Sequence, residues 1–472
     1  MKTMLIIICI LLSSEIVLIA QNNTWSDIYS KDFLAPDAPI HSISANQLGI
    51  FVAGWIREVN FNTDKKMVVR NIAKWKDSVW EGVGGNGPIN GVNGTIYSIS
   101  YDSQNLYVCG EFDTAGNIAS NRITAWDGNS WQSLGNTTPP YRNISSLCAY
   151  NGSVYVGGKY DSIGGQIAYS IAKYNGSTWS TLGSGFRKMP TPQSISFWGE
   201  VSAIACRGTD VYVGGIFDTA GMVTAKNIAK WNGTEWQSMG AGIKGVINAI
   251  IAMPNGDVYV GGMFDSAGTV ATKNIAKWNG TEWCAINGLS GNIVYSLAND
   301  SNNLYVGGDF RIQGLDSSTG LAMWDGENWN SVGGGISGSV YCMNFYDGSL
   351  YVGGHFGSVG NERLSVFNIA KWQVREPIES ENMQMKPNEI IVRSYPNPNV
   401  SDNVTIEFEL KDAGMTTIQV LTAQGEIVEE LSRKHFLAGN HIISWKIPQK
   451  TSSQAYFCRI IQNGNVKVNN IT

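Results

Sequence analysis

The chain has 472 residues and a formal net charge of −5, from 33 basic and 38 acidic side chains. Charged residues make up only 15% of the chain, whereas glycine (54) and tryptophan (16) are abundant. This composition excludes a coiled coil or a disordered chain, and the balanced charge argues against a nucleic-acid or anionic-membrane partner. It favours many short strands joined by tight turns.

The first twenty residues have the pattern of a secretory signal. Met1 and Lys2 form a basic start, and the apolar run 5–12 is followed by a second apolar stretch that ends at Ala20. We expect residues 1–20 to be a signal peptide, because the apolar stretch is short for a membrane anchor and Glu15 interrupts it. No later segment is long and apolar enough to span a bilayer.

A repeat of 46–57 residues fills most of the chain, and its clearest copy is the sequence Val-Tyr-Val-Gly-Gly at 258–262. Its last glycine recurs at Gly54, Gly110, Gly158, Gly215, Gly262, Gly308 and Gly354. An aromatic column follows at Trp75, Trp126, Tyr174, Trp231, Trp278, Trp324 and Trp372. A tryptophan stands five residues later at Trp80, Trp131, Trp179, Trp236, Trp283 and Trp329.

Each repeat predicts four short strands, a to d, which indicates a propeller blade rather than a helical solenoid. Seven copies of strands a, b and c are followed by only six of strand d, because the last repeat stops at Trp372. The segment around Trp25 has the strand d pattern, so we expect it to pair there and close the ring. The predicted fold is all-β, with a seven-bladed β-propeller over residues 22–373.

This pattern resembles kelch-like and galactose-oxidase-central-domain-like propellers, in which Gly–Gly ends strand b, an aromatic lies in strand c and a tryptophan in strand d. Gly215, Trp231 and Trp236 hold those places in one copy. The chain has a shorter c–d turn and lacks the kelch arginine before strand a. The resemblance implies a fold and no function. Because only His41 and His355 lie in the propeller, the galactose oxidase metal site does not carry over, and we expect no metal or cofactor.

The columns themselves are expected to be structural. We predict that the repeated tryptophans pack between blades, and that the lysine before each aromatic, such as Lys230, lies between blades with its ammonium group paired. Six cysteines remain after the signal, without a CxxC pair, and we expect most to be buried and unpaired. A disulfide framework stays open for an exported chain. These cysteines are Cys109, Cys148, Cys206, Cys284, Cys342 and Cys458.

Every long insertion falls in the b–c and d–a loops, which share one face of a propeller. The insertions 57–69, 136–143 and 185–200 bring aromatic and basic residues to that face, the usual composition of interface anchors. We predict that this face binds a partner protein or a glycan, with tolerated loop growth as the alternative. The candidate residues are Trp55, Arg57, Lys65, Lys66, Tyr141, Arg142, Arg187, Lys188, Phe197 and Trp198.

One repeat position, directly after the Gly–Gly pair, carries Glu111, Asp309 and His355 in three copies. Carboxylates on one face could serve a polysaccharide hydrolase or lyase, although ordinary solvated positions explain them too. Two GxGxxG matches, 240–245 and 333–338, precede no predicted helix and are not dinucleotide sites. We therefore name no catalytic residue. A binding or adhesion module is favoured, and an extracellular polysaccharide-active enzyme is the alternative.

Four b–c turns begin with Asp, then Ser or Thr, then an apolar residue. This looks like the O-glycosylation acceptor of Bacteroidota, and an Asx-turn in which the aspartate caps the turn is the alternative. The candidate acceptors are Thr114, Ser162, Thr219 and Ser266.

The composition changes after Trp372. Residues 374–394 are polar and predict a linker, and strand patterns at 404–410, 416–421, 426–431, 440–445 and 455–461 predict a small β-sandwich over 395–472. The opening Tyr-Pro-Asn-Pro at 395–398, the run 418–425, the turn 437–441 and the segment 455–460 look like a type A C-terminal sorting domain of the Bacteroidota type IX secretion system. That resemblance implies Sec export, the type IX machinery as partner, and a secreted or outer-membrane-surface location. An accessory module is the alternative.

Overall fold

The computed structural model describes residues 24–26, 38–59, 67–77, 79–84, 90–134, 143–189, 199–300, 302–361, 363–366, 368–373, 391–395, 403–410, 413–422, 427–446, 456–462 and 465–470. Every secondary-structure element assigned within these ranges is a strand, so the described chain is all-β, as predicted. Two compact units divide the chain, Met1–Glu376 and Pro377–Thr472, and each is described by itself.

The first unit contains, in its described residues, seven antiparallel sheets of four principal strands. The first sheet has β2 (Ile40–Asn46), β3 (Gly49–Gly54), β6 (Ile72–Lys76) and β7 (Val79–Gly82). The second has β8 (Thr95–Tyr101), β9 (Leu106–Glu111), β12 (Ile123–Trp126) and β13 (Trp131–Ser133). The third has β14 (Ile144–Tyr150), β15 (Ser153–Gly158), β18 (Ile171–Tyr174) and β19 (Trp179–Thr181).

The remaining sheets repeat this order. The fourth has β21 (Glu200–Arg207), β22 (Asp210–Ile216), β25 (Ile228–Trp231) and β26 (Trp236–Ser238). The fifth has β27 (Ile243–Ala252), β28 (Val258–Ala267), β30 (Ile275–Trp278) and β31 (Trp283–Ala285). The sixth has β32 (Leu289–Asn299), β33 (Leu304–Ile312), β34 (Leu315–Trp324) and β35 (Trp329–Ser331). The seventh has β36 (Ile336–Tyr346), β37 (Ser349–Val359), β39 (Ile369–Gln373) and β1 (Thr24–Ser26).

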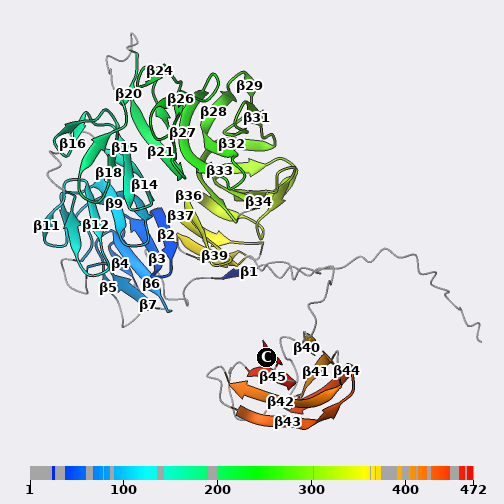
Figure 1. The fold of residues 1–472 in the computed structure, drawn as a ribbon. Coiled ribbons are helices and arrows are strands. Elements are labelled where there is room, and N and C mark those ends of the chain that lie inside the picture. The colour runs from blue at the N-terminus through cyan, green and yellow to red at the C-terminus, as the bar shows by residue number, and fades with distance from the viewer. Residues whose placement is uncertain are drawn as a thin grey trace, which may run out of the picture. The chain divides into compact units, whose positions relative to one another are not determined.

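The sheets are arranged as in a propeller, around a common centre near which β2, β14 and β36 lie (Figure 1). Contacts between the innermost strands run from β2 through β8, β14, β21, β27 and β32 to β36, and β36 in turn contacts β2. Each core is formed by buried side chains from two neighbouring sheets. The apolar face of a sheet is removed from water only when another element packs against it. Gly353 of the seventh sheet, for example, packs against Ile40 of the first.

Small ribbons, which the four-strand repeat did not predict, form at the connections between the second and third strands of the sheets. They are β4 (Glu58–Val59) with β5 (Met67–Val68), β10 (Thr114–Ala115) with β11 (Ile118–Ala119), and β16 (Ser162–Ile163) with β17 (Gln166–Ile167). β23 (Thr219–Ala220) pairs with β20 (Phe186–Arg187) and β24 (Val223–Thr224), while β29 (Val270–Ala271) pairs with β28 and β38 (Leu364–Ser365) with β37.

The two aromatic columns pack against each other within every sheet. The ring centroids of Trp231 and Trp236 are 5.3 Å apart, and the other pairs have nearly the same separation. The outer tryptophan also binds the preceding sheet, as Trp236 Nε1 donates to the carbonyl of Leu182 at 2.9 Å. These aromatics therefore hold neighbouring sheets together, which is the packing role that the sequence predicts.

β1 takes the place of the outermost strand in the seventh sheet. It pairs with β39, with Trp25 opposite Trp372 and the two rings 5.0 Å apart. Trp25 Nε1 donates to the carbonyl of Gly333 at 3.1 Å, and the outer tryptophans of the third to sixth sheets make the equivalent bond. The segment at Trp25 thus lies where the sequence predicts it, beside the segment that ends at Trp372.

An asparagine with a positive φ angle joins several sheets to their neighbours. Asn227 has φ 63°; its Oδ1 accepts from the Phe217 amide, and its Nδ2 donates to the carbonyls of Ile243 and Gly245 in the next sheet. Asn368 makes the equivalent bond from the seventh sheet to Ala38, before the first sheet. This residue precedes the Ile-Ala-Lys-Trp segment, and the sequence analysis assigned it no role.

Replacing Asn227 with alanine is expected to lower the free energy of unfolding by about 2–3 kcal/mol, because it removes three hydrogen bonds and places a Cβ-bearing residue without a polar side chain at a left-handed angle. Urea denaturation measures the loss. Asn227→Gly tolerates the angle and loses only the bonds, so it should fall between wild type and Asn227→Ala. Equal stability of all three proteins would contradict the assigned role.

The repeated lysines are paired, as predicted. Lys230 Nζ lies 2.8 Å from an Asp210 carboxylate oxygen, and Lys277 Nζ lies 3.5 Å from Asp257. In the third sheet Lys173 instead lies over the ring of Tyr155, 5.5 Å from its centroid.

The prediction that most cysteines are unpaired holds for four of the six and is wrong for one pair. Cys148 and Cys206 form a disulfide between the innermost strands β14 and β21, with their Cα atoms 6.3 Å apart. The expectation of mostly unpaired cysteines missed this pair, because the two residues become neighbours only when adjacent sheets pack. The free cysteines of the described chain are Cys109, Cys284, Cys342 and Cys458, of which Cys284 alone is not fully buried.

The disulfide predicts a labelling result. The mature chain, unfolded without reductant and treated with a maleimide, should take up four labels, because four of its six cysteines are free. Reduction before labelling should give six, and Cys148→Ala should give five in either case because it frees Cys206. Intact mass spectrometry counts the labels. Six labels without reduction would contradict the bridge.

The second unit consists of two antiparallel sheets. One has β40 (Ile391–Tyr395), β41 (Asn403–Leu410) and β44 (Gly439–Lys446), and the other has β43 (Ile427–Phe436), β42 (Gly414–Thr422), β45 (Tyr456–Gln462) and β46 (Asn465–Asn470). Side chains of both sheets, including Phe408 and Ile418, share one core. The linker was predicted to extend over 374–394, but β40 begins inside it, at Ile391. The sequence analysis did not interpret the Ile-Ile-Val run at 390–392 as part of a strand.

Candidate functional site

Each innermost strand has a β-bulge at the equivalent position. One residue of each bulge has no partner in the pairing with the second strand of its sheet. Several of the bulged residues bond to the next sheet: Ser145 Oγ donates to Val201, and Asn248 Nδ2 donates to Val294 at 3.1 Å. His41 Nδ1 lies 3.2 Å from the carbonyl of Ile96, and burial lowers the pKa of His41 although this bond opposes the shift. The bulge column is therefore part of the inter-sheet bonding.

The three candidates after the Gly–Gly pair lie in different sheets and bond locally. Glu111 in β9 accepts a hydrogen bond from the Tyr97 hydroxyl at 3.0 Å, which together with burial raises the pKa of Tyr97. Asp309 in β33 accepts from Asn292 Nδ2 at 3.2 Å, and His355 is exposed on β37. Glu111 and Asp309 belong to the second and sixth sheets, and the bonds that they accept come from residues of their own sheets.

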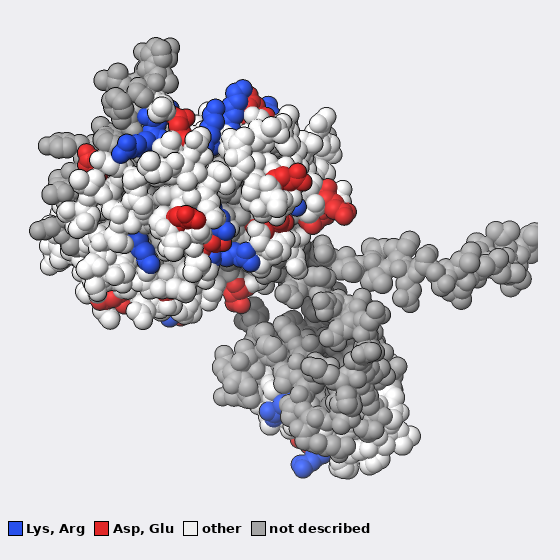
Figure 2. All heavy atoms as spheres, turned by 45° about the horizontal axis from the view of Figure 1, so that its top comes forward, with Lys and Arg blue, Asp and Glu red and all other residues white. Residues whose placement is uncertain are grey.

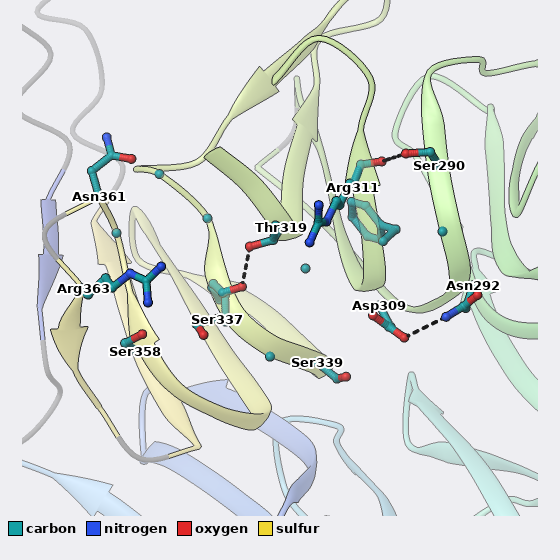
Figure 3. A pocket seen from close by; sticks show the side chains of 18 residues that line it. Ser290, Asn292, Asp309, Arg311, Thr319, Ser337, Ser339, Ser358, Asn361 and Arg363 are labelled. Atoms are coloured by element: carbon teal, nitrogen blue, oxygen red, sulfur yellow. Dashed lines mark hydrogen bonds between the residues drawn. The ribbon is translucent and has the colours of Figure 1, made fainter. Parts of the chain in front are cut away.

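A polar cleft lies between the sixth and seventh sheets, with a volume of about 850 Å³. We call it the 6–7 cleft. It contains two arginines, one carboxylate, and many hydroxyl and amide groups, and Figure 3 shows these side chains on facing strands. Its polar side chains are Ser290, Asn292, Asp309, Arg311, Thr319, Ser337, Ser339, Ser358, Asn361 and Arg363.

Arg311 and Arg363 point into the 6–7 cleft from opposite walls, with Ser337 between them (Figure 3). Arg311 is on β33 and Arg363 is in the turn between β37 and β38. Both are exposed, and neither has a carboxylate within 4.0 Å among the residues that the structure describes. Two unpaired guanidinium groups can bind an anion in the forked geometry that suits a carboxylate.

The loop-face candidates do not form one cluster in the described chain. Trp55 is 53% exposed and the Arg57 guanidinium lies over its ring, 5.1 Å from the centroid. Arg187, three sheets away on β20, lies over Tyr169, and Lys188 follows it. The other candidates, Lys65, Lys66, Tyr141, Arg142, Phe197 and Trp198, lie outside the described residues.

The candidate glycosylation acceptors are all half-buried at the start of the connecting ribbons. Ser162 Oγ donates to the Asp161 carboxylate at 3.0 Å, and Ser266 Oγ donates to Asp265 at 3.3 Å. These bonds join the hydroxyl group to the neighbouring carboxylate and are not the carboxylate-to-backbone bonds of an Asx-turn. Modification of Thr114, Ser162, Thr219 and Ser266 stays a prediction, which an intact mass of the secreted protein checks.

Sequence reasoning noted Asp309 but missed the rest of the 6–7 cleft. One signal was available: two residues after the variable position, four sheets have aspartate (Asp113, Asp161, Asp218 and Asp265), whereas the sixth has Arg311. The first sheet has Arg57 at this position as well, so the aspartate is replaced by arginine in two copies of the repeat on the loop-bearing face. Arg363 carried no such signal, because it lies in a turn that is longer than in the second to sixth repeats and has no equivalent position there.

Figure 2 shows charged side chains in small, separate groups on a largely uncharged surface of the first unit. Within the described residues, no three His, Cys, Asp or Glu side chains are grouped so as to hold a metal ion. Within the described residues the structure has no helix that is long and apolar enough to cross a bilayer, since every assigned element there is a strand.

Comparisons with known proteins show no family for this chain. No protein-family model and no curated protein matches the chain. Among solved structures, the chain is similar to one described as a novel fungal alcohol oxidase with catalytic diversity among the AA5 family, in complex with copper. The identity is 11%, the TM-score is 0.38, and the match covers 95% of this chain and 99% of that one. At this similarity the match carries no conclusion about this chain, and the oxidase's activity and copper are said of that protein alone.

Proposed function

We propose that the protein is a secreted or cell-surface binding module built on a closed seven-bladed β-propeller. Three features support closure: β1 pairs with β39, β36 contacts β2, and Asn368 bonds to Ala38. The Cys148–Cys206 disulfide supports an oxidising, extracytoplasmic location, in agreement with the signal pattern of residues 1–20.

The observation that carries the binding function is the 6–7 cleft. Its lining offers hydrogen-bond donors and acceptors with little apolar surface, which suits a hydroxyl-rich ligand such as a glycan better than a lipid or an apolar peptide. Its volume lies within the roughly 300–1,000 Å³ of typical ligand sites. The ligand class follows from this chemistry, and the propeller fold by itself supports no ligand.

The test is a glycan array together with pull-down from surface extracts, using the mature full-length protein. Saturable binding without turnover supports the module. The second candidate, a polysaccharide-active enzyme, is favoured by one observation, the presence of Asp309 in the cleft. Turnover on a polysaccharide panel that Asp309→Asn abolishes would favour the enzyme, since a carboxylate is the usual acid or base in that chemistry.

We further propose that the second unit directs export through the type IX secretion machinery. The support is the Tyr-Pro-Asn-Pro opening with the later segments, together with a two-sheet unit that has its own core. Removing residues 395–472 should retain the protein inside the outer membrane of a type IX-competent host. Unchanged secretion of the truncated chain would leave the unit as an accessory module.

A further inference from the structure

We propose that the 6–7 cleft binds an acidic saccharide, and that Arg311 and Arg363 together receive its anionic group. This inference rests on the proposed function as a binding module and names the ligand class. It starts from the two guanidinium groups, which lie on opposite walls of one cleft and point toward the same space (Figure 3).

The repeat shows that Arg311 is a departure from the common structure. At its equivalent position Asp218 Oδ2 accepts a hydrogen bond from the Met189 amide, and Asp265 lies 3.8 Å from Lys244 Nζ. Arg311 can accept neither type of bond, and its own side chain makes no hydrogen bond or ion pair within the described structure. The first sheet also has an arginine at this position, Arg57, but its guanidinium group lies over the ring of Trp55. The Arg311 side chain has no such partner in the described structure, which leaves it available to a ligand.

Arg363 is held in an uncommon backbone conformation. Its φ is +51°, an angle that glycine or asparagine normally occupies, and its amide donates to the carbonyl of Gly360 at 3.1 Å. A residue with a long side chain at such an angle in a binding cleft is a typical site of functional strain. The turn thereby directs a second cation into the cleft opposite Arg311.

The rest of the lining suits the hydroxyl groups of a sugar. Thr319 Oγ1 donates to the carbonyl of Ile336 at 2.8 Å, which leaves its lone pairs available as acceptors, and Ser337 lies between the arginines. Phe310, the aromatic residue of this lining, is buried and offers no ring for stacking. Polar and charge-assisted bonds must therefore supply the recognition.

Asp309 makes one end of the cleft negatively charged. It lies near Asn292, away from Arg363 (Figure 3), and its carboxylate can accept hydrogen bonds from sugar hydroxyls while repelling an anionic group. The anionic group of a bound saccharide is thus placed between the arginines, with hydroxyl groups toward Asp309. A carboxylate and a sulfate share this chemistry, and binding measurements distinguish them.

The test uses the mature full-length protein and three probes in isothermal titration: an oligogalacturonate, the same oligomer with its carboxyl groups reduced, and a heparin-derived sulfated oligosaccharide. We expect an acidic probe to bind and its neutral counterpart to bind at least tenfold more weakly. Arg311→Gln and Arg363→Gln should each weaken acidic binding roughly tenfold to a hundredfold, because each removes a charge-assisted contact. Arg70→Gln and Arg433→Gln, exposed arginines outside the cleft and outside the predicted binding face, are the matched controls and should bind like wild type.

Each outcome has a definite consequence. Dependence on Arg311 and Arg363 with the oligogalacturonate supports a carboxylate ligand, and the same dependence with the sulfated probe alone supports a sulfate. Equal binding of the acidic and neutral oligomers, or loss of binding in the control variants instead, overturns the inference while leaving a glycan-binding module. Binding of a partner protein with no saccharide bound on the array also overturns it. Absence of any saturable ligand overturns the inference and the proposed function together.

Discussion

Replacing Trp25 with alanine is expected to lower the free energy of unfolding by about 3 kcal/mol and to release the N-terminal segment from the ring. The substitution removes an indole that lies 5.0 Å from Trp372, and with it the hydrogen bond to the carbonyl of Gly333. Truncating a packed tryptophan costs about 3–5 kcal/mol in protein cores, and Trp25 is half-buried. β1 has only three residues, so little else holds it on β39.

The effect of Trp25 on closure can be separated from its effect on packing. Trp329 is the matched control, because it is also half-buried, lies 5.2 Å from Trp324 and donates to a carbonyl of the preceding sheet. Both alanine variants should lose stability in urea denaturation. Only Trp25→Ala should expose the edge of β39, so it alone should show rapid proteolysis near the N-terminus and concentration-dependent association. Wild-type behaviour of Trp25→Ala would show that β1 does not close the ring.

The repeating part of the fold could be predicted from sequence because its packing places the same demand on every copy. A glycine where the next sheet approaches and a tryptophan where two sheets meet recur at a fixed spacing, as at Gly214 and Trp236. If Gly214 had a Cβ, that atom would lie 2.6 Å from Ile247 Cγ2 in the next sheet. Glycine stands at this position in five repeats and a small residue, Ala53 or Cys109, in the other two, so the contact produces a period in the sequence.

Features that depend on a single pair of sheets could not be predicted in this way. Cys148 and Cys206 belong to different repeats and differ by one position within them, so no period joins them. The 6–7 cleft likewise depends on Arg311 from one sheet and Arg363 from the next. Both residues deviate from their own repeat, and only the packing of the two sheets shows that the deviations meet.

The second glycine of the Gly–Gly pair is required for a different reason, a close approach of the neighbouring backbone. Replacing it is expected to give the largest loss of stability. In the seventh sheet, Gly354 of β37 faces the bulge in β36, where Tyr341 lies outside the ladder. A Cβ at Gly354 would lie 2.1 Å from the carbonyl oxygen of Ser339 and 3.0 Å from the Tyr341 amide nitrogen. Both are backbone atoms, so side-chain rotation cannot relieve the contact.

Gly354→Ala is therefore expected to lower the free energy of unfolding by about 3 kcal/mol or more, since the bulge must move or the strand must separate. Gly357, three residues along the same strand, is the control: no atom lies within 4 Å of the position of its Cβ, and its φ is not in the left-handed region. Gly357→Ala should change stability by no more than about 0.5 kcal/mol, because alanine only reduces the freedom of the unfolded chain. Urea denaturation of the two variants measures the difference. If Gly354→Ala were as stable as Gly357→Ala, the bulge would not be what requires glycine, and the inter-sheet bonds that the bulged residues make would need another explanation.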